Sequence, residues 1–565
     1  MPSDSVPELS SMEVARLLLA ALQTHGVRDV VICPGSRSAP LAYALAEAEA
    51  AGTIRLHVRI DERVAGFTAL GLTLAGGGPV AVLTTSGTAV GELLPAVMEA
   101  NHVGAKLVVL SADRPAELHG TGANQTTNQI DLFGAHVRGS VTIPAGTRPD
   151  ALVAEALAFA RGTAAVAPGP VQINVAFRDP LVPAPGDRLP EFGANVTYPP
   201  VALASDNEPG WRNHKAVTER RTVVVAGHGA GPEAEGFARA LGLPIFAEPS
   251  SNARFGPNAI GPYRTLLSSH MARIERVVLF GRPTLTRPVG MLLANPDIVS
   301  ALWAPAPAPW FEPGRRREQA IGNPAELAEF AGVGPEGWLG QWQELGRQAE
   351  EAIEQVLAAD GVLDGPAVAR ETWALSRGNL VLGSSNVIRD ADLCGRPAPH
   401  PSATVYANRG LAGIDGTLAT ATGIAQARGG RKTTLLVGDV TFLHDVGALL
   451  IGEGEAAPEM DVVVLNDSGG AIFSTLEHGA VAESGRYANA VERLFATPHR
   501  VRIQPLAQAY GWEYLAVDTV DELRDVLQRP GTRRIIEVAV TRSGLRALHA
   551  GIAARTGELA WPPIR

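Results

Sequence analysis

Short apolar runs alternate along the chain with longer segments of helical periodicity. From Met12 to about Ala176 these runs contain many β-branched residues and end in turn residues, which is typical of buried strands. They are DVVICPG (29–35), IRLHVRID (54–61), PVAVLTTSG (79–87), KLVVLSADRP (106–115) and GPVQINVAF (169–177). Strands that alternate with helices predict a doubly wound parallel sheet.

Two further blocks repeat this pattern. The second contains RTVVVAGHGAG (221–231), LPIFAEPSS (243–251) and ERVVLFGRPTL (275–285). The third contains NLVLGSS (379–385), ATVYANRG (403–410), KTTLLVGDV (432–440), DVVVLND (461–467) and RRIIEVAV (533–540). Proline-rich stretches at 179–200 and 304–313 are typical of a linker and a loop. We therefore expect three α/β domains, at 1–185, 200–350 and 360–565, with similar sheets in the first and third.

The composition fits a large, loop-rich α/β enzyme. Of the 565 residues 46% are hydrophobic, and 61 glycines and 42 prolines mark many turns. The net charge of −10 argues against general binding of nucleic acid. Two cysteines, Cys33 and Cys394, argue against a disulfide framework. The first apolar segment indicates an amphipathic helix rather than a signal peptide, and no apolar run is long enough to span a membrane, so we expect a soluble cytoplasmic protein.

Two predicted strands of the third block end in acidic corners. The stretches are GDVTFLHDVGALL (438–450) and VVVLNDSGGAIF (462–473), which place Asp439 and Asp467 where a helix should begin. Either aspartate alone could cap its helix. Two such corners side by side indicate a divalent cation held between carboxylates, with phosphate bound at the helix N-termini.

Polar residues follow many of the other strands, at the sheet edge where ligands bind in α/β domains. In the first block they are Ser36, Arg37, Glu62, Ser86, Gly87, Thr88, Arg114, Asn124 and Gln125, and in the third they are Ser384, Ser385, Arg389, Arg409, Asp439 and Asp467. Four of these are arginines beside glycine-marked corners, which favours a site for anionic substrates. Pairing with the many acidic residues is the alternative interpretation.

Three weaker signals favour structural roles. GHGAGP (227–232) follows a strand like a dinucleotide turn, but a proline stands where G-x-G-x-x-G requires its last glycine, so a structural turn is favoured. His444 and Asp445 lie near Asp439, yet no metal-binding histidine spacing is present, and we expect His444 on a helix surface or at the edge of the active site. Cys33 ends a strand and is expected to be a buried small residue.

Together these motifs resemble the thiamine-diphosphate-dependent enzymes. GDVTFLHD followed by LNDSGG is similar to the metal motif of that superfamily, and Glu62 matches its early glutamate. The ordered set PGSRSAPL, DER, TTSGTA, SADRP, GANQT, ANRGLAGIDG and NDSGGAIF is close to one branch, the carboligases of menaquinone biosynthesis. The resemblance covers essentially the whole chain. It departs at Val440, where the superfamily has glycine, and it leaves Asn466 as an alternative to the favoured metal ligand Asp467.

The resemblance implies three domains of the thiamine-diphosphate-binding fold type: pyrimidine-binding, central and diphosphate-binding. It implies decarboxylation of 2-oxoglutarate on thiamine diphosphate and addition of the succinyl carbanion to isochorismate. Glu62 is implied as the catalytic residue, hydrogen-bonded to the pyrimidine ring, and Ile414 as the apolar wedge that bends the cofactor. A homodimer or dimer of dimers is also implied, with each site shared between two chains.

The same resemblance implies which residues bind the cofactor, the metal ion and the substrates. The implied cofactor contacts are Glu62, Ser385, Gly413, Ile414, Asp439, Asp467 and Ile472, and the implied ligands of Mg²⁺ or Mn²⁺ are Asp439, Asp467 and Gly469. The implied substrate contacts are Ser36, Arg37, Arg114, Asn124, Gln125, Arg287, Arg389 and Arg409, with Arg282 a further contributor.

Two other functions remain open from the sequence. A carboligase or decarboxylase acting on pyruvate would prefer that 2-oxo acid and form no product from isochorismate. A nucleotide- or metabolite-binding protein without catalysis would turn over no 2-oxo acid, and replacing Glu62 would have no effect.

Overall fold

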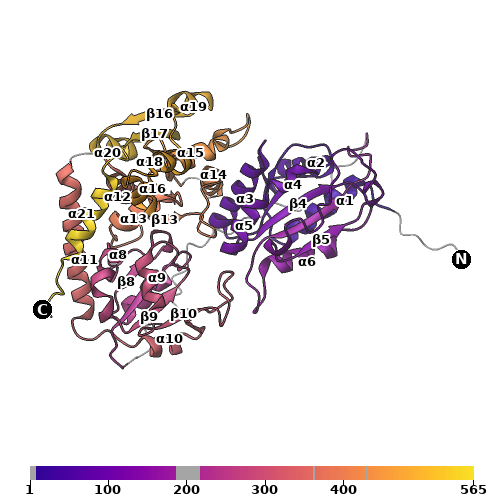
Figure 1. The fold of residues 1–565 in the computed structure, drawn as a ribbon. Helices are drawn as coiled ribbons and strands as arrows, with labels where there is room; N and C mark the ends of the chain where they lie inside the picture. Colours follow the sequence, from indigo (N-terminus) through magenta and orange to yellow (C-terminus); the bar gives the residue numbers. More distant parts are fainter. Residues whose placement is uncertain (1–7, 186–210, 212–216, 361–362, 428–430, 565) are drawn as a thin grey trace.

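The computed structural model describes residues 8–185, 211, 217–360, 363–427 and 431–564. Its strands form three sheets, of six, five and six strands, and neighbouring strands in each sheet are parallel. Figure 1 shows the three sheets, each with helices around it. The predicted fold class, three doubly wound parallel-sheet domains, is confirmed.

The first sheet has the strand order β2-β1-β3-β4-β6-β5. Its strands are β1 (Asp29–Ile32), β2 (Arg55–Val58), β3 (Val80–Thr84), β4 (Leu107–Asp113), β5 (Ser140–Ile143) and β6 (Val171–Ala176). Its helices are α1 (Ser11–Thr24), α2 (Ala39–Ala50), α3 (Glu62–Gly76), α4 (Thr88–Gly91), α5 (Leu94–Val103) and α6 (Asp150–Arg161). Because successive side chains of a strand point to opposite faces, Val31 packs in one core with α3 and α5, and Val30 and Ile32 pack in another with α1, α2 and α6.

The central sheet has the order β11-β10-β9-β7-β8. Its strands are β7 (Thr222–Ala226), β8 (Ile245–Ala247), β9 (Arg276–Phe280), β10 (Val299–Trp303) and β11 (Gln319–Ile321). Its helices are α7 (Glu233–Ala240), α8 (Tyr263–His270), α9 (Arg287–Ala294), α10 (Pro324–Ala331) and α11 (Trp338–Asp360).

The third sheet repeats the first, with the order β13-β12-β14-β15-β17-β16. Its strands are β12 (Gly378–Leu382), β13 (Ala403–Tyr406), β14 (Thr433–Gly438), β15 (Met460–Asn466), β16 (Glu513–Val517) and β17 (Arg533–Ala539). Its helices are α12 (Gly365–Leu375), α13 (Asn386–Cys394), α14 (Thr417–Ala427), α15 (Asp439–His444), α16 (Ile472–Thr475), α17 (Glu477–Glu483), α18 (Ala488–Val491), α19 (Ile503–Ala509), α20 (Val520–Gln528) and α21 (Leu545–Gly557). The expected similarity of the first and third sheets is confirmed.

The predicted strands are all present, and four unpredicted strands join them. Three of the additions, β5, β11 and β16, lie at sheet edges, and each mixes buried with half-buried or exposed positions. The fourth is β10. The predicted loop at 304–313 contains no helix or strand. The predicted linker lies largely outside the described residues, and the domain bounds remain a prediction.

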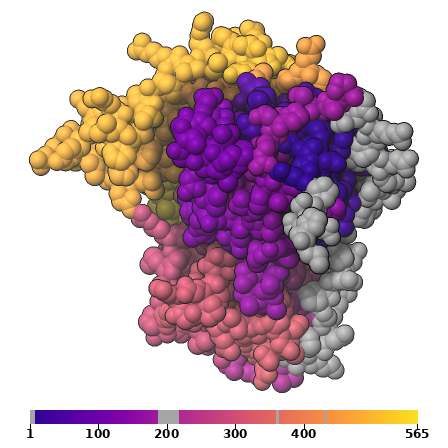
Figure 2. Space-filling model, turned by 90° about the vertical axis from the view of Figure 1, so that its right-hand side faces the viewer, coloured from indigo at the N-terminus to yellow at the C-terminus, as the bar shows by residue number. Residues whose placement is uncertain are grey.

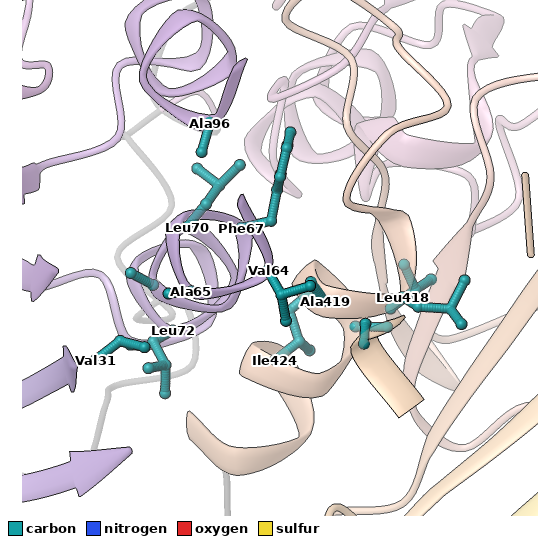
Figure 3. Packing of buried hydrophobic residues seen from close by; sticks show 14 of the residues in the cluster. Val31, Val64, Ala65, Phe67, Leu70, Leu72, Ala96, Leu418, Ala419 and Ile424 are labelled. Atoms are coloured by element: carbon teal, nitrogen blue, oxygen red, sulfur yellow. The ribbon is translucent and has the colours of Figure 1, made fainter. Parts of the chain in front are cut away.

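The first and third domains meet through α3 and α14. Figure 3 shows Val64 of α3 beside Ala419 and Ile424 of α14, and these residues belong to one buried core with Phe67 and Leu418. Arg63 also forms an ion pair of 2.8 Å with Asp445, which accepts the N–H of Ala419 at the start of α14. In the space-filling view the first domain lies in front of the other two (Figure 2).

Candidate functional site

A small pocket of about 60 Å³ lies where β14 and β15 end, in the third domain. Five predicted cofactor or metal residues line it: Ser385, Asp439, Asp467, Gly469 and Ile472. All of its lining residues lie between Gly365 and Leu545, so the first domain of the same chain contributes none. The structure therefore brings these five predicted residues together, with Asp439 and Asp467 in one pocket.

Asp439 is the first residue of α15 and is held by three donors. Its Oδ2 accepts the N–H of Gly469 at 2.9 Å and lies 3.0 Å from Nε2 of His499, while its Oδ1 accepts the N–H of Val440 at 2.7 Å. Burial raises the pKa of Asp439 despite these contacts. The carboxylate is thus fixed in place, and a cation would relieve the cost of its burial.

Asp467 fits a metal better than Asn466 does. The side chain of Asn466 is engaged elsewhere, since its amide donates to Glu537 at 2.6 Å and its oxygen accepts the N–H of Ser468 at 3.0 Å. Oδ1 of Asp467 is buried without a hydrogen-bond partner, and Arg542 Nε lies 3.5 Å from it. Burial first, and then the charge of Asp439, raise the pKa of Asp467 to about 7. An unsatisfied carboxylate oxygen beside a second carboxylate is a suitable ligand for a hard divalent cation.

Few other protein ligands are available. Within the described residues, no group of three or more histidine, cysteine, aspartate or glutamate side chains is arranged to hold a metal. A cation between Asp439 and Asp467 would complete its coordination with backbone oxygen, water and phosphate, which suits Mg²⁺. Ser385 precedes α13 and makes no capping hydrogen bond, and Ser385, Asn386 and Val387 line the same pocket. The start of α13 is therefore a candidate place for phosphate.

The loop that carries Gly413 and Ile414 follows β13 and leads into α14. Both residues are half-buried and neither lines the pocket at Asp439. Glu99 of α5 holds this loop, accepting the N–H groups of Gly410 and Leu411 at 2.6 and 2.7 Å. The first domain therefore positions a third-domain loop from within the same chain.

Two of the predicted substrate arginines line a larger cleft beside the pocket. Arg287 and Arg389 lie in a cleft of about 810 Å³ between α8, α9, α13 and α21, together with Arg264 and Arg546. Arg389 donates to the backbone oxygen of Ser385 at 2.6 Å, and Ser385 itself lines the pocket, so the cleft adjoins the pocket. Burial, and then the charge of Arg264, lower the pKa of Arg389. Arg287 is exposed and forms an ion pair with Glu477 across the cleft.

The first-domain residues form a separate group at the end of their own sheet. Arg114 donates to Oγ of Ser86 at 2.6 Å and to the backbone oxygen of Gln125 at 2.5 Å, and Gln125 Nε2 donates back to Ser86 at 2.8 Å. Burial, and then Arg37, lower the pKa of Arg114. Arg37 donates to the backbone oxygen of Phe177 at 2.8 Å. Ser36, Asn124 and Gln125 are exposed.

Glu62 is the first residue of α3 and does not line the pocket at Asp439. Asp61 caps the helix by accepting the N–H of Val64 at 3.0 Å, which leaves the Glu62 side chain free of the capping role. Glu62 is half-buried, and this burial is the main cause of its raised pKa. A glutamate that retains its proton more readily than usual can share that proton with a ring nitrogen.

The weaker sequence signals have structural explanations. The tip of the GHGAGP turn is paired with Arg282, since each of His228 and Arg282 donates its N–H to the other's oxygen at 2.9 Å. A β-carbon at Gly227 would lie 2.2 Å from the backbone of Arg282, so the turn packs directly against the loop after β9. Cys33 is fully buried, and burial raises the pKa of its thiol. His444 ends α15 with its side chain exposed. The structural-turn, buried-cysteine and helix-surface predictions are confirmed.

Sequence reasoning missed several residues of the site. His499 contacts Asp439, Glu99 holds the loop before Ile414, and Thr284 of the central domain contacts Arg409. Glu99 and Thr284 lie 311 and 125 residues from their partners, and His499 follows Asp439 by 60 residues and lies outside any recognised motif. In the sequence, the signal for Glu99 was an acidic residue within the largely apolar segment 94–103.

Comparison with known proteins agrees with this geometry. Residues 12–132 match the model of the thiamine pyrophosphate enzyme N-terminal TPP binding domain, and residues 396–534 match that of the C-terminal TPP binding domain. The first matched segment contains Glu62, and the second contains Asp439 and Asp467. Within the described residues, every helix is too short or too polar to cross a membrane.

Curated relatives match the chain over nearly its whole length. Proteins named 2-succinyl-5-enolpyruvyl-6-hydroxy-3-cyclohexene-1-carboxylate synthase are 59% identical in Arthrobacter sp. (strain FB24), over 99% of this chain and 94% of the relative, and 61% identical in Paenarthrobacter aurescens, over 97% of both. The relative of that name in Mycobacterium avium is 43% identical over 96% of this chain and 98% of its own length. The chain therefore belongs to the 2-succinyl-5-enolpyruvyl-6-hydroxy-3-cyclohexene-1-carboxylate synthase family of thiamine pyrophosphate enzymes.

Proposed function

We propose that this chain decarboxylates 2-oxoglutarate and joins the remaining four-carbon unit to isochorismate. The products are 2-succinyl-5-enolpyruvyl-6-hydroxy-3-cyclohexene-1-carboxylate and CO₂, in menaquinone biosynthesis. The observation that carries the proposal is the contact of Arg389 with Ser385, which sets a cleft containing arginines directly beside the pocket of Asp439 and Asp467. Both substrates carry carboxylates, and guanidinium groups bind carboxylates through charge-assisted hydrogen bonds.

The pocket is the proposed place of the cofactor diphosphate and its metal. Asp439, Asp467 and the backbone oxygen of Gly469 would hold Mg²⁺ or Mn²⁺, with Ser385 and Ile472 beside the diphosphate. When bound, thiamine diphosphate supplies the thiazolium carbon that stabilises the carbanion left by decarboxylation. The protein contributes orientation, charge and control of protons.

Glu62 and Ile414 act at the pyrimidine side in this proposal. Glu62 holds a proton toward a ring nitrogen, a role that its raised pKa supports. Ile414 and Gly413 shape the cofactor from the loop that Glu99 fixes. The substrate carboxylates meet Arg389 and Arg409 from the third domain, Arg287 from the central domain, and Ser36, Arg37, Arg114, Asn124 and Gln125 from the first domain.

The active unit is proposed to be a homodimer or a dimer of dimers in the cytoplasm. The pocket at Asp439 is lined by third-domain residues of its own chain, whereas Glu62 belongs to the first domain. A second chain would supply the missing pyrimidine side, so that each site is shared.

Two measurements test the proposed function. Acid extraction of the purified protein should release thiamine diphosphate, and CO₂ should form from 2-oxoglutarate faster than from pyruvate when isochorismate is present. Preference for pyruvate, with no product from isochorismate, would reject the substrate assignment. Absence of turnover with every 2-oxo acid tested would reject catalysis.

A further inference from the structure

Glu248 begins a chain of contacts that runs from the central domain to Arg409. Glu248 follows β8 and is 2% exposed. Its Oε1 accepts the N–H groups of Thr284 and Leu285, both at 2.9 Å. These two residues belong to the loop 281–286 between β9 and α9, so a single buried carboxylate holds the backbone of that loop.

Thr284 of this loop in turn contacts Arg409. The guanidinium of Arg409 donates to Oγ1 of Thr284 at 3.1 and 2.8 Å, and to its backbone oxygen at 3.1 Å. Arg409 is 3% exposed and lies close to the backbone oxygen of Ser384 as well, at 3.5 Å. Burial lowers the pKa of Arg409, and the nearby charge of Glu248 opposes that effect. The oxygens of Thr284 and Ser384 are neutral, so these hydrogen bonds position the guanidinium without neutralising its charge.

The GHGAGP turn supports the same loop from behind. Gly281 has a φ of 62°, and a β-carbon there would lie 2.5 Å from the backbone oxygen of His228. The turn and the loop therefore touch through backbone on both sides, at Gly227 and at Gly281. The guanidinium of Arg282, in the same loop, also donates to the backbone oxygen of Gly410 at 2.8 Å, next to Arg409 in the third domain.

We propose that the central domain positions the substrate-binding arginine: Glu248 fixes the loop 281–286, and Thr284 of that loop fixes the guanidinium of Arg409. Glu248 and Thr284 are thus positioning residues for carboxylate recognition. This inference rests on the proposed function, because it assigns Arg409 to substrate, and it assigns to the central domain a task that its fold alone does not reveal.

The first test separates the hydroxyl of Thr284 from its shape. Thr284→Val removes the Oγ1 acceptor and keeps the branched side chain, whereas Thr284→Ser keeps the acceptor. Thr284→Val should raise KM for at least one of the two carboxylate substrates about tenfold or more, since a charge-assisted hydrogen bond is lost. The affinity for thiamine diphosphate should not change, and the KM of Thr284→Ser should stay close to that of the wild type. An unchanged KM for both substrates in Thr284→Val, or an equal rise in Thr284→Ser, would overturn the proposal.

The second test does not require turnover. Glu248→Ala should speed amide hydrogen exchange at Thr284 and Leu285, and Glu248→Gln should not, because its amide oxygen can accept the same two N–H groups. Equal exchange in wild type and Glu248→Ala would overturn the proposal even in an active enzyme. If the wild type fails to turn over 2-oxoglutarate while exchange follows the expected order, the proposed function fails and the restraint on the loop stands.

Discussion

Gly71 and Gly423 lie at the crossing of α3 and α14, and neither position has room for a side chain. A β-carbon at Gly71 would lie 2.1 Å from the backbone oxygen of Thr420, and one at Gly423 would lie 2.1 Å from that of Thr68. The two helices therefore meet through their backbones. This contact joins the domain that carries Glu62 to the domain that carries the proposed metal site.

Gly423→Ala should destabilise the protein at this crossing. An added methyl group must push the helices apart, which we expect to lower the free energy of unfolding by about 1–3 kcal/mol. Denaturant unfolding followed by circular dichroism measures the change. The matched control is Gly76→Ala, at the end of α3, where a β-carbon meets no atom within 4 Å. Equal stability of the two variants would contradict a tight crossing.

The architecture was predictable because its signal is local. A strand that is buried on both faces of its sheet consists of a run of apolar residues. The buried strands β1, β3 and β4 were therefore found from the sequence. The strands β5, β11 and β16 were not, since each mixes buried with half-buried or exposed positions.

The site was predictable only where function requires a motif. Asp439 and Asp467 follow adjacent parallel strands, β14 and β15, so sequence order alone places them near each other. Glu99, Glu248 and Thr284 act through contacts with segments far away in the chain, and no spacing rule connects such partners. Long-range positioning contacts of this kind become visible only in the folded chain.

Asp467→Asn should weaken metal-dependent cofactor binding. Its buried Oδ1 has no hydrogen-bond partner, so it is the oxygen that a divalent cation would use. We expect at least a tenfold loss in affinity for thiamine diphosphate in the presence of Mg²⁺, measured by calorimetry, because a neutral amide is a much weaker ligand. Asn466→Ala is the comparison. A larger loss of Mg²⁺-dependent binding in Asn466→Ala than in Asp467→Asn would make Asn466 the ligand.

Replacing Arg389 or Arg409 by alanine should weaken the use of carboxylate substrates. Loss of one charge-assisted hydrogen bond corresponds to roughly 1.5–3 kcal/mol in kcat/KM. Cofactor binding should survive, since neither arginine lines the pocket at Asp439. Steady-state kinetics and cofactor calorimetry together decide the point. If both variants lose thiamine diphosphate and keep their substrate affinity, these arginines are assigned to the wrong ligand.

The buried carboxyl of Glu248 should make stability depend on pH. Burial first, and then the charge of Asp392, raise the pKa of Glu248 to about 7 from an ordinary value of 4.5, while Arg409 opposes the shift. Between pH 4.5 and about 7 the folded chain keeps a proton that the unfolded chain has lost, so the contribution of Glu248 to stability falls as the pH rises.

Glu248→Gln removes this dependence. The stability of the variant relative to wild type should therefore rise with pH, by up to roughly 3 kcal/mol between pH 4.5 and 8. Urea unfolding at a series of pH values measures the difference. A stability difference that stays constant across this range would show that Glu248 does not hold its proton in the folded protein.

The last prediction concerns the sharing of sites between chains. The pocket at Asp439 is lined by residues between Gly365 and Leu545, while Glu62 lies in the first domain and outside that pocket. One bound cofactor must touch both sides. Glu62→Gln should fail to hold the required proton, and Asp439→Ala should fail to hold metal, so each variant alone should be nearly inactive.

Mixing the two variants distinguishes the arrangements. If sites are shared, a mixed dimer contains one site with two intact halves and one with both defects, so activity per mixed dimer should return toward about half of the wild-type value. Subunit exchange is followed independently, with two differently tagged chains purified in sequence. If each site forms within a single chain, every site in the mixture keeps one defect. Demonstrated exchange without recovery of activity would therefore refute the shared site, because the intact first domain of one chain and the intact third domain of the other would then not form an active site.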